Sequence, residues 1–529
     1  MNRFPTKSWF RLLLLALTVA APAIAAGTNP PPDLWPLATN SAAVHRFSTL
    51  FTAQDVRDNL NSDAKIQKAL DWCKQTGVTR VYIESFRDGY QPDRAVLLKL
   101  KNLFATNGFE VSGCITPTHL GKASAGWNVA CCFTDLPTQA KLKSEFEFAA
   151  GLFDEMMIDD FLFTDCPCPD CNKARLAKTV NVLGKKYPVN GDSWPDYRCE
   201  LMVRLSRAAI LDAARKVNPN ARIIIKFPQW YDEFQKSGYD VTRQSADFDR
   251  TWVGTETRDS EDKEWGACPP YAAYFIMRWL GGIGGSKCGG GWYDWLGTSQ
   301  ATYVEQARQT ILGGAPESML FAYGGLQGDN GPADVQALRA NIPELLAVAR
   351  EVSRRTATGI AAYRPAGSDA GDEPRLFDFA GMIGLPLAPC HKFPTNAPAA
   401  AFSVCSAADP NLAAELAAYI ATGKPVLITD GLAQKLKDRV NLAAANVQIL
   451  AIKGAPRSVL KLNQDQIDTL RTPLLRPFGC TFRAPAKVAL YLFTDGSWVV
   501  ENFNDTAAKA TLNGESLALP ARAWLCRWK

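Results

Sequence analysis

Histidine is scarce in this chain, and neither sign of charge dominates it. Only 3 of the 529 residues are His, which argues against a metal centre built from several imidazoles. The 58 basic and 53 acidic side chains give a formal net charge of +5, too small for this length to indicate nucleic-acid binding. We therefore expect no nucleic-acid partner, no cofactor and no metal in the catalytic site. A hydrophobic share of 47% excludes extended disorder.

Long hydrophobic runs are also lacking, apart from a short one near the N-terminus. Three basic residues flank or precede the apolar segment 12–20, and residues 23–25 (Ala-Ile-Ala) offer a small-residue cleavage pattern. The run is shorter than the ~20 residues of a membrane span. We predict a signal peptide over residues 1–25, a secreted or periplasmic protein, and no membrane contact after cleavage. Cleavage removes three basic residues and no acidic one, so the net charge falls from +5 to +2 and favours a neutral substrate.

Residues 46–355 alternate short β-branched or aromatic runs with longer amphipathic segments, after a Pro-rich leader over residues 26–45. Eight strands are predicted: Arg80–Glu84, Phe109–Pro117, Val129–Thr134, Glu155–Phe163, Arg222–Phe227, Thr251–Glu256, Ala272–Trp279 and Ser318–Tyr323. Eight strand–helix units of this spacing indicate a (β/α)₈ TIM barrel rather than an open sheet.

Two smaller units are predicted after the barrel. Residues 356–460 continue the strand–helix alternation and indicate a small α/β domain of flavodoxin- or amidotransferase-like type. Residues 461–529 change to alternating strands with turns at Asp495-Gly496 and Asn504-Asp505, which indicates an antiparallel β-domain. This order resembles the β-galactosidases that join a catalytic barrel to a trimerisation domain and a β-domain. That resemblance leaves a homo-oligomer open, and its catalytic glutamates have no counterpart on these strands.

Ionisable and aromatic side chains stand at the ends of the predicted strands, where barrel enzymes carry their active groups. Burying such groups costs free energy, so their presence there points to pairing or function. The ionisable residues and tyrosine concerned are Glu84, His119, Asp159, Asp160, Lys226, Glu256, Arg258, Arg278 and Tyr323.

The strongest local signal is the segment 154–165, DEMMIDDFLFTD. Adjacent strand residues point to opposite faces, so only one of Asp159 and Asp160 can face the barrel interior. The segment resembles the fourth strand of the α-galactosidase (melibiase) clan and of related glycosidase-like barrels. Matching that motif puts Asp154 at the position of the motif's first Asp and implies that Asp159 is the nucleophile. Asp160 is the alternative if the phase of the strand shifts by one residue.

A second catalytic acid is expected on another strand. Glycoside hydrolysis needs one carboxyl group to attack or to activate water and another to protonate the leaving oxygen. Glu256 ends the predicted sixth strand, where the melibiase clan carries its acid/base. The separation of the two carboxyl groups, ~5–5.5 Å for retention or ~6.5–9.5 Å for inversion, decides the stereochemistry, and we favour retention.

Flat aromatic side chains favour a carbohydrate as the substrate, because sugar rings stack on them. Candidates near strand ends are Trp230, Trp279 and Trp292. The run 281–291, GGIGGSKCGGG, matches no phosphate-binding pattern, and we interpret it as a loop beside the cleft with Asp294 as a further contact.

Cysteine is the residue type with two open interpretations. Cys166, Cys168 and Cys171 lie within six residues, directly after the predicted fourth strand. Three thiolates could bind zinc with one further ligand, but an exported protein favours disulfides that fix the loops above the barrel. The sequence as a whole favours a secreted glycoside hydrolase. A non-catalytic carbohydrate-binding or scaffold protein and a Cys-ligated metal-dependent hydrolase are the alternatives.

Overall fold

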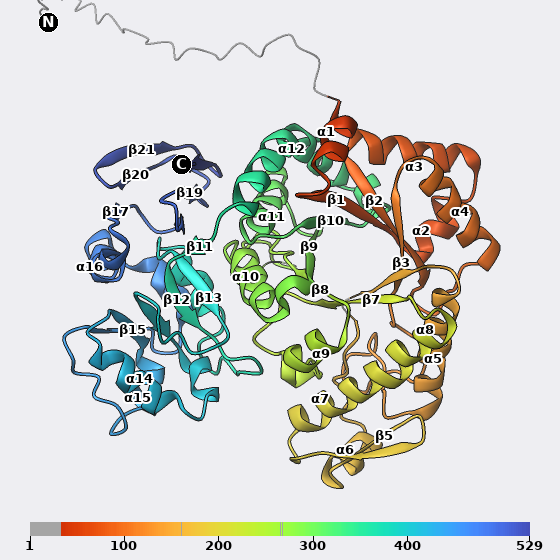
Figure 1. The fold of residues 1–529 in the computed structure, drawn as a ribbon, viewed down its shortest axis with the longest axis horizontal. Coiled ribbons are helices and arrows are strands. Elements are labelled where there is room, and N and C mark those ends of the chain that lie inside the picture. The colour runs from red at the N-terminus through yellow and green to blue at the C-terminus, as the bar shows by residue number, and fades with distance from the viewer. Residues whose placement is uncertain (1–32, 160, 265, 267) are drawn as a thin grey trace, which may run out of the picture. The chain divides into compact units, whose positions relative to one another are not determined.

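A closed eight-stranded parallel barrel forms the first part of the chain (Figure 1). The computed structural model describes residues 33–159, 161–264, 266 and 268–529, so the predicted signal peptide and Asp160 lie outside the described residues. In barrel order the strands are β1 (Arg46–Phe51), β10 (Glu317–Phe321), β9 (Cys288–Asp294), β8 (Arg250–Gly254), β7 (Arg222–Phe227), β4 (Glu155–Ile158), β3 (Glu110–Ile115) and β2 (Val78–Phe86). β1 pairs with both β2 and β10, which closes the sheet.

Two of the eight strands differ from those predicted. Residues Val129–Thr134 lie in the loop between β3 and α5 (Leu136–Ala150), and Ala272–Trp279 belongs to helix α10 (Ala272–Gly284). Short apolar runs in strands and in buried helices cannot be separated by periodicity alone. α10 is apolar because it is buried, and the hydroxyl of its Tyr274 donates to the carbonyl of Leu387 at 3.1 Å.

The barrel instead uses β1 and β9, which the sequence pattern did not indicate. β9 begins inside the glycine-rich run that we interpreted as a loop. A Cβ at Gly289 would lie 2.5 Å from Nε1 of Trp252, and one at Gly290 would lie 2.6 Å from the carbonyl oxygen of Glu317. Glycine is therefore required here for close packing inside the barrel rather than for a flexible loop.

Helices cover the outside of the barrel, as Figure 1 shows. They include α3 (Asp63–Gln75), α4 (Arg94–Thr106), α5, α7 (Trp194–Leu205), α8 (Asp212–Val217), α10, α11 (Gln300–Leu312) and α12 (Gly331–Ser353). Part of the predicted leader is also helical, because α1 spans Leu34–Ser41 with Asp33 as its N-cap. Among the described helices, none combines the length and the apolar character needed to cross a bilayer.

Apolar and charged layers fill the barrel interior. The apolar layer consists of Leu50, Tyr82, Cys114, Met157, Ile224, Trp252, Trp292, Met319 and Ala322. Toward the N-terminal ends of the strands, Arg80 pairs with Glu155 and lies 3.2 Å from Glu317. These three charges are buried, so they stabilise the barrel only as a paired set.

The second sheet is parallel, as predicted for the α/β unit. Its strand order is β13 (Leu387–Cys390), β12 (Ile360–Tyr363), β14 (Ala400–Phe402), β15 (Val426–Thr429) and β16 (Val447–Leu450). Helix α14 (Leu412–Ala421) buries Leu412, Leu416 and Tyr419 in the same apolar cluster as residues of β12, β14 and β15.

The C-terminal strands form two antiparallel sheets. One has the order β11 (Ala357–Thr358), β18 (Val488–Phe493), β19 (Trp498–Asn502) and β22 (Trp524–Arg527), and the other β17 (Phe482–Arg483), β20 (Ala508–Leu512) and β21 (Glu515–Leu519). β11 comes from the start of the predicted α/β segment but pairs with β18. Hydrogen bonds also join the later units to the barrel, for example from Tyr231 to Asp378 at 2.9 Å.

Candidate active site

Asp159 lies directly after β4 and is the centre of a buried charge network at the barrel mouth. Its Oδ1 accepts a hydrogen bond from Nζ of Lys226 at 2.5 Å. Its Oδ2 accepts from Arg87 and, at 3.2 Å, from the hydroxyl of Thr116. Asp159 is therefore the member of the predicted acid pair whose side chain the structure places in this network.

The two cations decide the protonation state of Asp159. Burial alone would raise the pKa of this carboxyl group, because a charge is poorly solvated in the protein interior. The charges of Lys226 and Arg87 outweigh burial and hold the pKa well below its usual range. The carboxyl group of Asp159 is consequently ionised at neutral pH and well below it.

Glu84, on β2, holds the arginine of this network in place. Its Oε2 accepts from Nε of Arg87 at 2.8 Å and from the backbone N–H of Ala53 at 2.8 Å. Its Oε1 accepts from Thr116, which also bonds to Asp159. Burial raises the pKa of Glu84 despite the charge of Arg87. Both oxygens of Glu84 thus accept hydrogen bonds within the protein, and Oε2 holds Arg87 in place.

Lys226, on β7, is enclosed by aromatic rings as well as by Asp159. Its Nζ lies 3.8 Å from the ring centroid of Trp292 on β9 and 5.6 Å from that of Phe321 on β10. Cation–π contacts of this kind compensate part of the desolvation of a buried ammonium group. Trp292 is thus a wall of the barrel that supports Lys226.

Glu256 follows β8 by two residues and is 4% exposed. Gly254 makes room for it, since a Cβ at that position would lie 2.9 Å from Oε2 of Glu256 and 2.6 Å from the backbone nitrogen of Gln229. Glu256 therefore lies against the segment that follows β7. In barrel order β7 stands between β4 and β8, so Asp159 and Glu256 come from either side of Lys226.

Arg258, which follows β8, and Asp294, the last residue of β9, form a second ion pair. Nη2 of Arg258 lies 2.7 Å from Oδ2 of Asp294, and Nε lies 3.0 Å from Oδ1. Both residues were predicted to contact the substrate, and the structure brings them together as a bidentate pair. Arg258 has φ 57°, a left-handed conformation that costs free energy for a non-glycine residue.

Aromatic residues gather on the loops above β3, β4 and β7. Trp127, with 47% of its surface exposed, stacks on Phe163 with a centroid distance of 5.9 Å and 24° between the rings. Trp230 meets the same phenylalanine edge-on at 5.1 Å. The backbone N–H of Trp127 donates to Asp165, as does the hydroxyl of Ser124 at 2.5 Å. These contacts fix an exposed indole beside the residues that follow Asp159.

Four predicted residues lie away from this network. Arg278 and Trp279 belong to helix α10; Nη2 of Arg278 bonds to the carbonyl of Leu312 at 2.6 Å, and Nε1 of Trp279 bonds to that of Arg364 at 2.8 Å. Tyr323 packs against Phe51 and Trp72 with its ring in the layer between β1 and α3. His119 is on the loop after β3, exposed, with Nδ1 3.2 Å from Asp88. The predicted strand ended at Trp279, and only the continuation of the helical pattern to Gly284 distinguishes α10 from a strand.

Sequence reasoning missed Arg87, Thr116 and Trp127. Arg87 follows the predicted strand end at Glu84 by three residues, and β2 continues to Phe86, so the strand end was placed too early. Thr116 directly follows β3 and was within the predicted strand Phe109–Pro117, but a hydroxyl in such a run carries little signal.

The disulfides expected from the sequence are not formed in the structure. All fourteen cysteines, each of them within the described residues, are free thiols. The reason is spatial: the closest thiols gather as a group of four rather than as bonded pairs.

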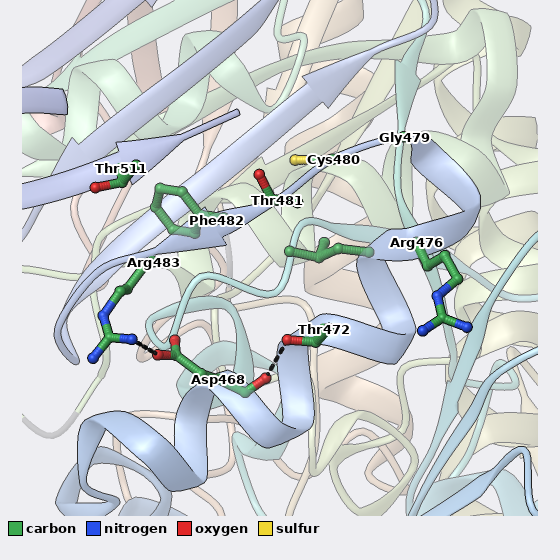
Figure 2. A pocket seen from close by; sticks show the side chains of 10 residues that line it. Asp468, Thr472, Arg476, Gly479, Cys480, Thr481, Phe482, Arg483 and Thr511 are labelled. Atoms are coloured by element: carbon green, nitrogen blue, oxygen red, sulfur yellow. Dashed lines mark hydrogen bonds and ion pairs between the residues drawn. The ribbon is translucent and has the colours of Figure 1, made fainter. Parts of the chain in front are cut away.

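A pocket of about 460 Å³ lies in the C-terminal region, between α16 (Gln464–Leu475), β17 and β20 (Figure 2). Figure 2 shows Arg483 directed to Asp468, 3.1 Å away, and Arg476 at the other end of the pocket. The residues that line it include none of those predicted for the catalytic site. Asp468 is the single carboxylate in that lining, so the pocket lacks the pair of acids that glycoside cleavage needs.

Comparison with known proteins agrees with the fold. Residues 36–339 match the family described as probable glycosyl hydrolase, catalytic domain. An uncharacterised protein of Saccharolobus solfataricus is 27% identical over an alignment of 305 residues, and the match covers 53% of this chain and 48% of that protein. The chain thus spans about half the length of this relative.

Two solved structures share the fold. α-L-Fucosidase isoenzyme 2 from Paenibacillus thiaminolyticus has a TM-score of 0.63 and 10% identity over 91% of this chain and 98% of that one. A catalytic mutant of Gan42B, a GH42 β-galactosidase from G. stearothermophilus, has a TM-score of 0.56 and 10% identity over 91% and 97%. The family match covers more than half of the chain, and the protein therefore belongs to the family described as probable glycosyl hydrolase, catalytic domain. All eight strands of the TIM barrel lie within the matched residues.

Proposed function

We propose that the protein is a secreted, retaining glycoside hydrolase that uses Asp159 as nucleophile and Glu256 as general acid/base. The observation that carries this proposal is the burial of Asp159 between Lys226 and Arg87, which keeps its carboxylate ionised. A nucleophile in this chemistry must be an anion before the substrate arrives, whereas its partner must deliver a proton.

The proposed reaction has two steps. Asp159 attacks the anomeric carbon while Glu256 gives its proton to the glycosidic oxygen, so that one C–O bond forms as the other breaks. Water then attacks the glycosyl–Asp159 ester and passes a proton to Glu256, which restores both residues. The acids follow strands separated only by β7, so the ends of these strands are two spacings of ~4.8 Å apart. Retention requires the two carboxyl groups to approach each other to ~5–5.5 Å across this distance.

A neutral glycan is the proposed substrate. The predicted mature chain has a formal charge of only +2, and the loops above Asp159 carry Trp127 and Trp230, each packed on Phe163. Exposed indole faces bind the C–H surfaces of sugar rings. The two similar structures are named as an α-L-fucosidase and a β-galactosidase, so fucosides and galactosides belong in the first substrate panel.

The decisive experiment is a screen of aryl glycosides and polysaccharides, followed by ¹H NMR of the first anomer released. We expect hydrolysis with retained configuration. D159N and E256Q should lose turnover by about 10²–10⁴-fold while still binding the glycan. E145Q is the matched control, because Glu145 is a buried acid on α5 that bonds to Lys141.

Three results would count against the proposal. A product of inverted configuration would show that Asp159 is not a nucleophile. Full activity of D159N or E256Q would show that the replaced residue takes no part in catalysis. A wild-type protein that binds a glycan but hydrolyses none would favour the non-catalytic carbohydrate-binding alternative.

Export is tested separately from catalysis. We expect the mature protein to be recovered outside the cytoplasm with its N-terminus at residue 26, after the Ala-Ile-Ala pattern. N-terminal sequencing of the mature form checks this, and an intact Met1 on the active protein would contradict it. Light scattering of the same sample measures the oligomeric state.

A further inference from the structure

Four cysteine thiols converge beside the proposed active site. We call them the cysteine cluster: Cys132, Cys166, Cys168 and Cys171. The first comes from the loop between β3 and α5, and the others from the segment between β4 and α6 (Pro169–Leu176) and from the first turn of that helix. Their Sγ atoms all lie within 4.8 Å of one another, and the side chains are buried.

The spacing of these thiols suits a metal better than disulfides. Three Sγ–Sγ distances are 3.5 Å (Cys168–Cys171), 3.6 Å (Cys132–Cys171) and 3.8 Å (Cys132–Cys168). A tetrahedral zinc site with Zn–S bonds of ~2.3 Å has sulfur–sulfur edges of ~3.8 Å. A disulfide bond instead brings two sulfurs to ~2.05 Å. The three distances thus resemble the edges of one tetrahedron.

Polar and cationic groups surround the cluster. The backbone N–H of Ala125 donates to Sγ of Cys166 at 3.4 Å, and the hydroxyl of Thr134 lies 2.9 Å from Sγ of Cys171. Lys122 and Arg198 interact electrostatically with thiols of the cluster. These cations and N–H groups offset the negative charge that four thiolates keep after binding a divalent ion.

We propose that the cysteine cluster binds one zinc ion through its four sulfurs. Zinc would replace the four thiol protons without any redox step, and tetrahedral sulfur coordination is typical of structural zinc. Four protein ligands leave no open position for water or substrate. The ion would therefore be structural, which separates it from the metal-dependent hydrolase considered from the sequence.

The proposed ion would join two loops that shape the active site. One loop carries Trp127 five residues before Cys132, and the other runs from Asp159 to Cys166 through Phe163. Asp165 already links these loops by accepting from Ser124 and from the backbone of Trp127. A zinc ion between Cys132 and the later cysteines would lock the exposed indole over the segment that begins at Asp159.

The test begins with the metal content of the purified full-length protein, measured by mass spectrometry with inductively coupled plasma. We expect one zinc per chain. After unfolding in the presence of a chelator, all 14 cysteines should react with an alkylating reagent without prior reduction, because none is held in a disulfide. Removal of zinc from the folded protein should lower Tm.

Substitutions localise the ion. C132S should lose zinc, whereas C526S should keep it, since Cys526 lies on β22 outside the cluster. C171H, which retains a side chain that binds zinc, should recover metal content relative to C171S. If the serine variants do not fold, the metal content and alkylation count of the wild type still decide the question.

Several outcomes would overturn the proposal. These are a metal-free wild type, disulfide-linked peptides among the four cysteines, iron in place of zinc, or equal zinc content in C132S and the wild type. None of these readouts depends on glycoside hydrolysis. The zinc site and the proposed catalytic residues can therefore fail independently of each other.

Discussion

The ammonium group of Lys226 lies 2.5 Å from a carboxylate oxygen of Asp159, and both side chains are buried. The pair joins the ends of two neighbouring barrel strands, β4 and β7. Arg87 reaches the second oxygen of the same carboxylate from the side of β2. One anion thus lies between two cations, and its ionisation depends on both of them.

Replacing Lys226 by Met should move the acidic limb of the activity profile to higher pH. Removing the ammonium group raises the pKa of Asp159, so the proposed nucleophile is protonated at a higher pH than in the wild type. An Asp beside one cation has its pKa lowered by about 1–3 units, and the limb should shift by a similar amount. The measurement is kcat/KM against pH, for K226M and likewise for R87M.

K99M is the control for this prediction. Lys99 is exposed and pairs with Asp63 at 2.9 Å on the outer helices, so its removal should leave the profile unchanged. An acidic limb that stays in place in both K226M and R87M would show that Asp159 is not the group that titrates.

Replacing Trp127 by Ala should weaken substrate binding more than catalysis. The indole is exposed and is held by Phe163 and Asp165, but it contacts none of the groups proposed to react. Aromatic stacking contributes about 0.5–1.5 kcal/mol, so KM should rise by roughly 2- to 12-fold with kcat nearly constant. Steady-state kinetics measure both. W528A, which removes a tryptophan that packs on Phe493, should leave KM unchanged.

Replacing Arg80 by Met should destabilise the barrel strongly. Arg80 neutralises Glu317 and Glu155 inside the barrel. Its loss leaves the carboxylate of Glu317 buried, with the hydroxyl of Tyr82 as its remaining partner among the described residues. Breaking one member of a buried pair costs about 3–5 kcal/mol. Urea unfolding of R80M measures this loss. The double variant R80M/E317Q should recover part of it, and no recovery would contradict the pairing argument.

A buried acid between the barrel and the C-terminal sheet predicts a pH-dependent stability. Burial, with the charge of Glu305, raises the pKa of Glu501 to about 8, and Gln309 and Tyr491 bond to its Oε2. The unfolded chain releases this proton near pH ~4.3. The contribution to stability is therefore full below that pH and is lost as the pH rises through about 8.

Comparing E501Q with the wild type measures this contribution. Between pH 5 and 8, the free energy of unfolding of the wild type should fall by roughly 1 kcal/mol per pH unit. That of E501Q should not show this fall. Arg308 and Arg522 also face Glu501 and oppose the shift, so their charges are kept in both proteins. Parallel stability curves for the two proteins would contradict the prediction.

Local sequence patterns were sufficient for part of the fold. β4, β7 and β8 were recognised because each is a short apolar run that ends in charged or polar residues, as parallel strands buried on both faces do. The same reasoning brought Asp159, Lys226 and Glu256 into one candidate site. It failed for β9, where glycines accommodate Trp252, and for α10, where burial on all sides removed the polar face of the helix.

Other features depend on contacts between distant segments. Cys132 stands 34 residues before Cys166, and no local pattern joins the two, yet the barrel brings the loops after β3 and β4 together. Likewise, the direction of Arg87 follows from the length of β2, which extends past the strand end indicated by Glu84.

Residue types and their spacing were enough to indicate the barrel class and an acid directly after the fourth strand, and the scarcity of imidazole pointed to carboxylates as the acid–base groups. Which charges pair, which aromatic rings line the mouth and which thiols meet depends on the packing of distant segments. Periodicity reports the face on which a side chain is buried. Ionisation and metal binding depend on partners a few ångströms away, and those partners come from other strands.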